Sequence, residues 1–252
     1  KKIDNLRFNI YNIYKSKKFI FKKDASLKIL HITNFNERYD GRLHYNTGRR
    51  LNNGFIRLGH SVLEFSDRDI VKHYKGLNDY TGSKTLNQKL INTVYNYKPD
   101  LLIFGHADLI KDNTLSYLKD NYKGLKIAQW FLDPLIKNGP DFKKNKARIL
   151  DKIELTDANF VTTSPDVLGF LPKNKKSLFM PNPTDPSFEV LNNYENNQCS
   201  MDVFFALSHG VHRGILKKGK YDERADFVNK LVELTPNVKF DLYGINNVQP
   251  IW

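Results

Sequence analysis

Two side chains with acid–base chemistry follow apolar, strand-like segments of this sequence. His106 comes after the run DLLIF and needs little change in pKa to exchange protons near neutral pH. Asp133 follows Trp130 and Phe131, and burial beside these rings would raise the pKa of its carboxyl group. Both are therefore candidates for general acid–base catalysis, with Asp40 as a third. The alternative is structural, because an Asp before a Pro often begins a turn and a strand-end His often bonds a carbonyl.

A basic loop that contains glycines follows the apolar run DVFFAL near the end of the sequence. Its glycines let backbone N–H groups approach a phosphate, and its arginine can bind one through two parallel hydrogen bonds. The pattern is neither a P-loop nor a GxGxxG fingerprint, and a solvated basic loop is the alternative. We expect phosphate contacts from Ser208, His209, Gly210, Arg213 and Lys218.

Regular elements must hold these side chains in place, and the first of them form a compact pattern. The apolar run at 29–32 predicts a strand, and a polar loop follows it over residues 35–45. Apolar residues then recur at helical spacing over 51–58, and residues 61–65 predict a second strand. This is a βαβ unit, in which a covering helix joins two parallel strands. Ligands bind beyond the carboxyl ends of such strands, so the polar loop is the first place to expect a site.

The alternation of strands and helices continues to about residue 180. We predict further strands at 100–104, 126–131, 159–163 and 176–180, and helices at 85–97, 113–121, 142–155 and from Ser164. Residues 67–80 are polar and read as irregular. One doubly wound α/β domain accounts for this pattern.

Three prolines within residues 181–186 interrupt the alternation, since proline removes a backbone donor and fixes the backbone. The pattern then restarts with a strand at 202–207, a helix at 223–234 and a strand at 238–243. Two strands are too few to bury a sheet with its helices, so we expect a partial second domain. The expected organisation is two Rossmann-like α/β domains, divided into an extension (1–26), a complete first domain (27–180), a linker (181–200) and the start of a second domain (201–252).

A formal net charge of +13 over 252 residues points to anionic partners. Residues 1–23 mix lysines with aromatic side chains and could lie on an anionic membrane surface; the alternative is a helix packed on the domain with its lysines solvated. No apolar run is long enough to span a membrane, and no signal-peptide pattern is visible. The single cysteine, Cys199, fits a reducing compartment. We therefore expect a cytoplasmic protein, free or peripheral at the inner membrane face.

No metal site is predicted. The seven histidines show no ligand spacing, and a lone cysteine argues against zinc. Asp67 and Asp69 flank Arg68 in a segment that looks like a surface loop, so we do not interpret them as a metal-binding carboxylate pair.

A set of motifs follows a definite order along residues 27–245. The first domain contributes KILHITN with GRRLNNGFIRLGHSV, then PDLLIFGH, QWFLDP and DANFVTTSPDVLGFL. The linker and second domain contribute FMPNPTDPSFE, DVFFALSHG and an arginine-bearing helix followed by KFDLYG. In this order the motifs resemble the GT-B glycosyltransferases, most closely their spore-maturation-protein-like branch.

The resemblance implies transfer of a sugar from a nucleotide-diphosphate sugar to an acceptor hydroxyl, in a cleft between the domains. The first domain would hold the acceptor (a glycan, a lipid-linked molecule or a protein) and the second would hold the donor. Asp133, His106 or Asp40 would supply the base, and the basic loop would neutralise the leaving diphosphate without a metal or a cofactor. The loop after the first strand, for which an exposed loop and helix cap is the alternative, would contact the acceptor or the donor phosphates through Gly41, Arg42, His44, Tyr45 and Asn46.

Two other functions remain open. A nucleotide-sugar epimerase on the same architecture would isomerise the donor without an acceptor. A nonenzymatic polyanion-binding protein would fit the positive charge and would show steeply salt-dependent binding. Nucleic acid is disfavoured, because the aromatic residues beyond residue 23 are not spaced as stacking platforms among basic residues.

Overall fold

The computed structural model describes residues 26–106, 108–139, 141–191, 195, 198–206 and 223–243. The chain forms two compact units, and the division falls between Glu189 and Val190. Two sets of predictions lie outside the described residues: the basic-aromatic segment 1–23, and the phosphate-binding candidates Ser208, His209, Gly210, Arg213 and Lys218.

A six-stranded sheet forms the first unit, in the order β2-β1-β3-β4-β5-β6, and every neighbouring pair is parallel. Its strands are β1 (Lys28–Thr33), β2 (Ser61–Ser66), β3 (Leu101–Gly105), β4 (Lys126–Phe131), β5 (Ala158–Val161) and β6 (Ser177–Phe179). The predicted α/β class and Rossmann-like doubly wound sheet are confirmed. Apolar runs such as LLIF in β3 suit this fold, because helices cover both faces of a parallel sheet.

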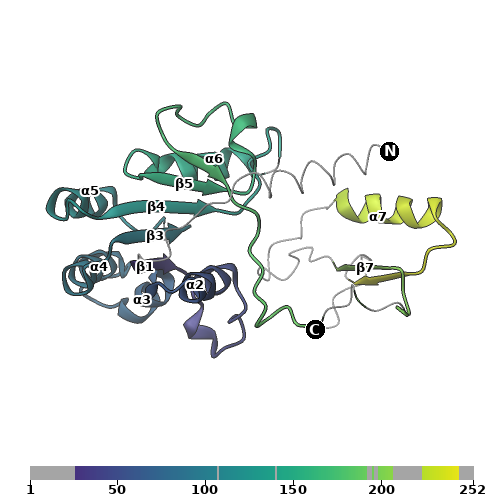
Figure 1. The fold of residues 1–252 in the computed structure, drawn as a ribbon, viewed down its shortest axis with the longest axis horizontal. Helices are drawn as coiled ribbons and strands as arrows, with labels where there is room; N and C mark the ends of the chain where they lie inside the picture. Colours follow the sequence, from purple (N-terminus) through teal and green to yellow (C-terminus); the bar gives the residue numbers. More distant parts are fainter. Residues whose placement is uncertain are drawn as a thin grey trace. The chain divides into compact units, whose positions relative to one another are not determined.

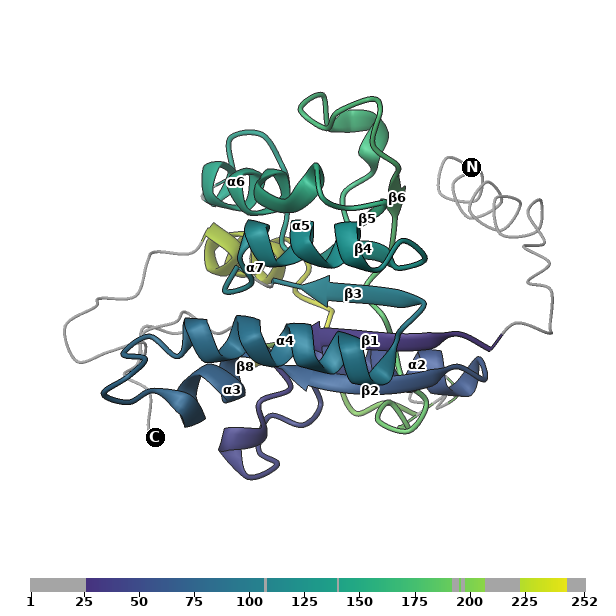
Figure 2. The same ribbon diagram turned by 90° about the vertical axis from the view of Figure 1, so that its left-hand side faces the viewer.

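Helices lie on both faces of the sheet (Figures 1 and 2). Ile29 and His31 of β1 face α2, whereas Leu30 and Ile32 face the opposite layer, as the two-residue period of a strand requires. That layer contains α4 and α5, and α6 covers the same face of β4 farther along the sheet. The helices are α2 (Thr47–Arg57), α3 (Asp67–Tyr74), α4 (Ser83–Tyr97), α5 (Asp112–Asn121) and α6 (Phe142–Ile153), with short 3-10 helices η1 (Glu37–Tyr39) and η2 (Pro165–Val167).

The second unit contains a parallel pair of strands, β7 (Val203–Ala206) and β8 (Phe240–Tyr243), with α7 (Glu223–Leu234) between them in the chain. Val228 of α7 is buried against Phe205 and Leu242 of the two strands. The predicted strand, helix and strand are all present in this unit.

One predicted segment is wrong. Residues 67–74, expected to be irregular, form α3, and Asp67 and Asp69 are buried in its first turn rather than exposed. The usable signal was the position of these acids directly after a strand, because carboxylates favour the first turn of a helix. The helix start predicted at Ser164 is present, with Ser164 as N-cap and Pro165 as the first residue, but the element is the 3-10 turn η2.

The segment before the division between the units is fixed on α2. Asp185 is fully buried and accepts hydrogen bonds from Asn53 (2.8 Å) and from Arg57, with which it also forms an ion pair. Glu189 accepts two hydrogen bonds from Arg50, at 2.8 and 2.6 Å. Residues 185–189 are therefore part of the first unit. Among the described residues, no helix has the length and apolar character needed to cross a membrane.

Candidate functional site at the carboxyl edge of the sheet

Two candidate residues meet where neighbouring strands end. β3 and β4 are paired so that Gly105 lies opposite Trp130, and His106 and Asp133 follow shortly after. This register brings His106 Nδ1 to 4.0 Å from Asp133 Oδ2. The two side chains therefore form a His–carboxylate pair, at a distance that a small movement of either would shorten to a hydrogen bond.

The surroundings of His106 favour its neutral form. Its ring stacks on that of Phe131, with 4.7 Å between centroids, and meets Trp130 edge-on at 6.1 Å. Burial lowers the pKa of His106, and the charge of Asp133 opposes that shift without reversing it. The backbone of His106 has φ of 53°, a left-handed conformation that is uncommon outside glycine and that occurs often at functional sites.

A pocket of about 230 Å³ opens beside His106, between the ends of β3 and β4 and the helix α6. Aromatic side chains form part of its wall, and its charged groups are already paired. Arg148 lies 3.7 Å from Asp108, and Lys152 donates to two carboxylates at 2.5 Å. The lining residues are Phe104, His106, Asp108, Gln129, Trp130, Phe131, Ala147, Arg148, Asp151 and Lys152.

A buried hydrogen-bonded chain holds Trp130 in place. Its Nε1–H donates to His31 Nε2 (3.2 Å), so His31 carries its proton on Nδ1 and donates it to Asn52 Oδ1 (3.4 Å). Asn52 in turn donates to Glu64 (2.8 Å). Burial lowers the pKa of His31 to about 4, so this histidine is a neutral packing residue, as the sequence indicated. Gly105 is required as well, because a Cβ there would lie 2.1 Å from the Trp130 ring.

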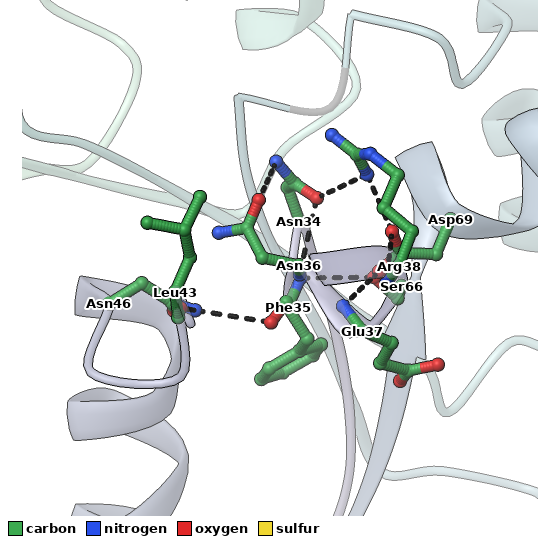
Figure 3. A network of polar contacts seen from close by, with 9 residues as sticks. All are labelled: Asn34, Phe35, Asn36, Glu37, Arg38, Leu43, Asn46, Ser66 and Asp69. Atoms are coloured by element: carbon green, nitrogen blue, oxygen red, sulfur yellow. Dashed lines mark hydrogen bonds and ion pairs between the residues drawn. The ribbon is translucent and has the colours of Figure 1, made fainter. Parts of the chain in front are cut away.

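The loop after β1 is held by a polar network (Figure 3). Asp69 accepts from the backbone N–H of Glu37 (2.9 Å) and from the Arg38 side chain (2.5 Å). Arg38 also donates to Asn34 (3.1 Å), and Ser66 Oγ accepts from the N–H of Phe35 (3.0 Å). These contacts hold the start of the loop against the first turn of α3.

The five residues of this loop that were predicted to contact a substrate, and Asp40 beside them, have different surroundings in the structure. Asn46 caps α2 by accepting from the N–H of Arg49 (2.9 Å), which is the structural alternative given above. Gly41 has φ of 85°, a conformation suited to glycine, and Asp40 has φ of 51°. The Arg42 guanidinium lies 5.3 Å from the centre of the Tyr39 ring, whereas His44 and Tyr45 are exposed.

Asp67 is a buried acid at the carboxyl edge that the sequence analysis placed on the surface. It is 1% exposed, and no side chain donates a hydrogen bond to either of its carboxylate oxygens. Burial raises the pKa of Asp67 to about 6, although the charge of Arg68 and its backbone N–H oppose the shift. The Arg68 side chain donates to Asp108 at 2.9 Å, so the carboxyl ends of β2 and β3 carry one connected cluster of charges. No three His, Cys, Asp or Glu side chains of the described residues lie close enough together to hold a metal ion.

Fold and site together define a Rossmann-like α/β protein with a candidate acid–base pair at the carboxyl edge of its sheet. No model of a known protein family matches the chain, and no curated protein matches it. Among solved structures it is similar to the glycosyltransferase SnogD from Streptomyces nogalater, with 17% identity, 90% of this chain and 68% of that chain covered, and a TM-score of 0.42. It is also similar to the isolated REC domain of RcsB from Salmonella enterica serovar Typhimurium, with 16% identity, 62% and 94% covered, and a TM-score of 0.30. At these scores neither likeness identifies the function.

Proposed function

We propose that this protein is a glycosyltransferase that moves a sugar from a nucleotide-diphosphate sugar to an acceptor hydroxyl, with His106 as the general base. One observation carries the proposal: His106 and Asp133, each a candidate for acid–base chemistry from sequence alone, lie 4.0 Å apart, and His106 lines a pocket. The family resemblance of the motifs supplies the reaction class.

The proposed proton path follows from the geometry of the pair. Asp133 is nearest to Nδ1 of His106, which leaves Nε2 to take the proton of the acceptor hydroxyl. A pKa lowered by burial keeps the imidazole neutral near pH 7, which is the form that accepts a proton. As the acceptor oxygen bonds to the anomeric carbon, the bond from that carbon to the diphosphate breaks. Asp133 then stabilises the imidazolium that has formed.

The remaining parts of the proposal concern the substrates. The basic loop with Arg213 and Lys218 would neutralise the leaving diphosphate without a metal, in a cleft between the domains. The acceptor, a glycan, a lipid-linked molecule or a protein, would lie at the loop after β1. The protein would act in the cytoplasm, with residues 1–23 available for contact with an anionic membrane surface.

The test combines donor binding with turnover in the full chain. Isothermal titration with UDP-, GDP- and ADP-sugars should identify one donor, and release of its nucleotide diphosphate should measure hydrolysis and transfer. His106→Gln should lower turnover by roughly 10²- to 10⁴-fold, the usual contribution of a general base, with donor affinity unchanged.

His73 of α3 provides a matched control, because it is an exposed histidine in the same unit. His73→Gln should turn over like the unmodified protein. Absence of binding and hydrolysis for every donor would contradict the proposal, and so would full activity of His106→Gln. Isomerisation of a donor without transfer or hydrolysis would favour the epimerase instead.

A further inference from the structure

Three aromatic rings gather on the surface of the first unit, away from the pocket beside His106. We call them the aromatic platform: His44, Tyr45 and Phe188. Tyr45 is 65% exposed, and its ring meets Phe188 edge-to-face with 4.8 Å between centroids. His44 lies 5.4 Å from Tyr45 and 5.9 Å from Phe188. A single exposed aromatic ring needs no explanation, but a contiguous exposed group is a candidate interaction surface.

Polar contacts fix the platform before any ligand arrives. Arg50 donates to the backbone carbonyl of Tyr45 (2.9 Å) and to Glu189 (2.6 Å), residues far apart along the chain. Its guanidinium lies 5.7 Å from the centre of the Phe188 ring. Phe188 also belongs to the turn that begins at the buried Asp185. A preformed site loses little conformational freedom on binding, which favours affinity.

The charges around the platform indicate the kind of ligand. Arg50 is already paired with Glu189 at 2.6 Å, which weakens its attraction for a phosphate. Glu189 remains 42% exposed and can accept hydrogen bonds from hydroxyl groups at the rim of the rings. Aromatic faces are apolar and carry a negative potential, which suits the weakly positive C–H face of a neutral sugar ring.

We propose that the aromatic platform is a carbohydrate subsite on which one pyranose ring of the acceptor stacks. Only the identification of this sugar as the acceptor rests on the proposed glycosyltransferase function. The proposal that a neutral sugar binds here does not depend on it. The proposal commits the acceptor to a glycan or a glycan-bearing molecule.

The test measures binding of neutral oligosaccharides to the full chain. The probes are tri- and tetrasaccharides of glucose, galactose, mannose and N-acetylglucosamine. Their binding is measured by saturation-transfer NMR and by isothermal titration. At least one should bind, and Tyr45→Ala should weaken that binding about tenfold, the scale of one stacking contact. Phe188→Leu keeps apolar bulk but removes the ring, and it should weaken binding by about threefold to tenfold.

Tyr95 of α4 is the matched control, because it is also 65% exposed and lies outside the platform. Tyr95→Ala should bind the sugar like the unmodified protein. Absence of binding to all probes, or equal binding by Tyr45→Ala, would overturn the subsite.

Donor hydrolysis separates this proposal from the one on which it rests. Hydrolysis of a nucleotide-sugar without Tyr45-dependent sugar binding would overturn the platform and leave the transferase. Tyr45-dependent sugar binding without any donor turnover would leave the subsite and overturn the transferase. Binding of a short RNA that Tyr45→Ala abolishes, with no sugar bound, would also overturn the subsite.

Discussion

His31 and His106 both contact Trp130, but the two histidines lie in different regions of the sheet. His31 is inside the sheet, where Trp130 and Asn52 satisfy both of its ring nitrogens. His106 is at the carboxyl edge, where its nearest charged partner, Asp133, is 4.0 Å away. Asp67 at the same edge is buried and accepts no hydrogen bond from a side chain.

The difference shows which polar side chains of this fold are free to react with a ligand. A buried polar group that is fully hydrogen-bonded contributes to stability and to a unique packing arrangement. A buried or half-buried group without a partner costs stability, and such groups cluster at functional sites. The interior chain from Trp130 to Glu64 is of the first kind. At the edge, Asp67 has no side-chain donor and His106 lies 4.0 Å from its carboxylate partner, so both are nearer to the second kind.

The largest expected effect comes from a methyl group added at Gly105, beside the Trp130 ring that both histidines contact. In Gly105→Ala the new methyl group would lie 2.1 Å from the Trp130 ring, so the ring must move and both histidines lose their contact with it. We expect a loss of about 3 kcal/mol in the free energy of unfolding, the upper end of the usual cost of overpacking, measured by urea denaturation. Gly54→Ala is the control, since a Cβ there meets nothing within 4 Å and alanine favours the helix. Equal stability of the two variants would break the comparison.

Next in size is removal of the interior histidine. His31→Leu leaves the Nε1–H of Trp130 and the Oδ1 of Asn52 without their partner, and should cost roughly 2–3 kcal/mol of unfolding free energy. His106→Leu, by contrast, keeps an apolar contact with Phe131 and should cost less than about 1 kcal/mol. Chemical denaturation of the two variants side by side measures the difference; a larger cost at His106 would reverse our assignment of the two regions.

Asp67 gives a pH-dependent prediction. Its pKa of about 6, against an ordinary value of 3.8, means that the folded protein holds this proton more tightly than the unfolded chain. Its contribution to stability is therefore greatest below about pH 4 and declines as the pH rises through 6. Asp67→Asn should remove that decline and raise the unfolding free energy at pH 7 by about 1–3 kcal/mol.

Asp69→Asn is the matched comparison, two positions along the same helix. Burial tends to raise the pKa of Asp69, but hydrogen bonds from Ser66, Glu37 and Arg38 lower it overall. This substitution should therefore destabilise the protein at pH 7. Thermal unfolding across pH 4–7 distinguishes the two variants, and a loss of stability at pH 7 in both would count against an unpaired Asp67.

The smallest effect is on the titration of the histidines themselves. NMR of the ring protons should show His31 titrating near pH 4. Since the charge of Asp133 raises the pKa of His106, Asp133→Asn should lower it further and leave His31 unchanged. An unchanged His106 pKa in this variant would show that the two side chains do not interact.

Sequence reasoning found the parts of the fold and site that depend on local patterns. Apolar runs and helical periodicity gave the strands and most helices, and a polar residue after an apolar run pointed to His106 and Asp133. His106 and Asp133 lie close together only because β3 and β4 are neighbours in the sheet. The sequence placed both residues at the carboxyl ends of strands, but it did not fix the order of those strands.

Long-range polar contacts were beyond such reasoning. Asp67 is buried in the first turn of α3, but the segment around it is rich in charges. The sequence therefore contained no apolar pattern from which this burial could be predicted. Asp185 pairs with Arg57, a residue 128 positions away, and one carboxylate among many in a sequence does not specify its arginine. Phe188 contacts Tyr45 because the turn that begins at Asp185 packs against α2, and the sequence does not indicate that packing.

Asp185 and Glu189 tether the chain to α2 up to the last residue of the first unit. The turn that contains Phe188 is therefore anchored to the first unit by two carboxylates, both bound to side chains of α2. Loss of these carboxylates would release that turn from α2, and Phe188 would lose its contact with Tyr45 while the sheet stayed unchanged.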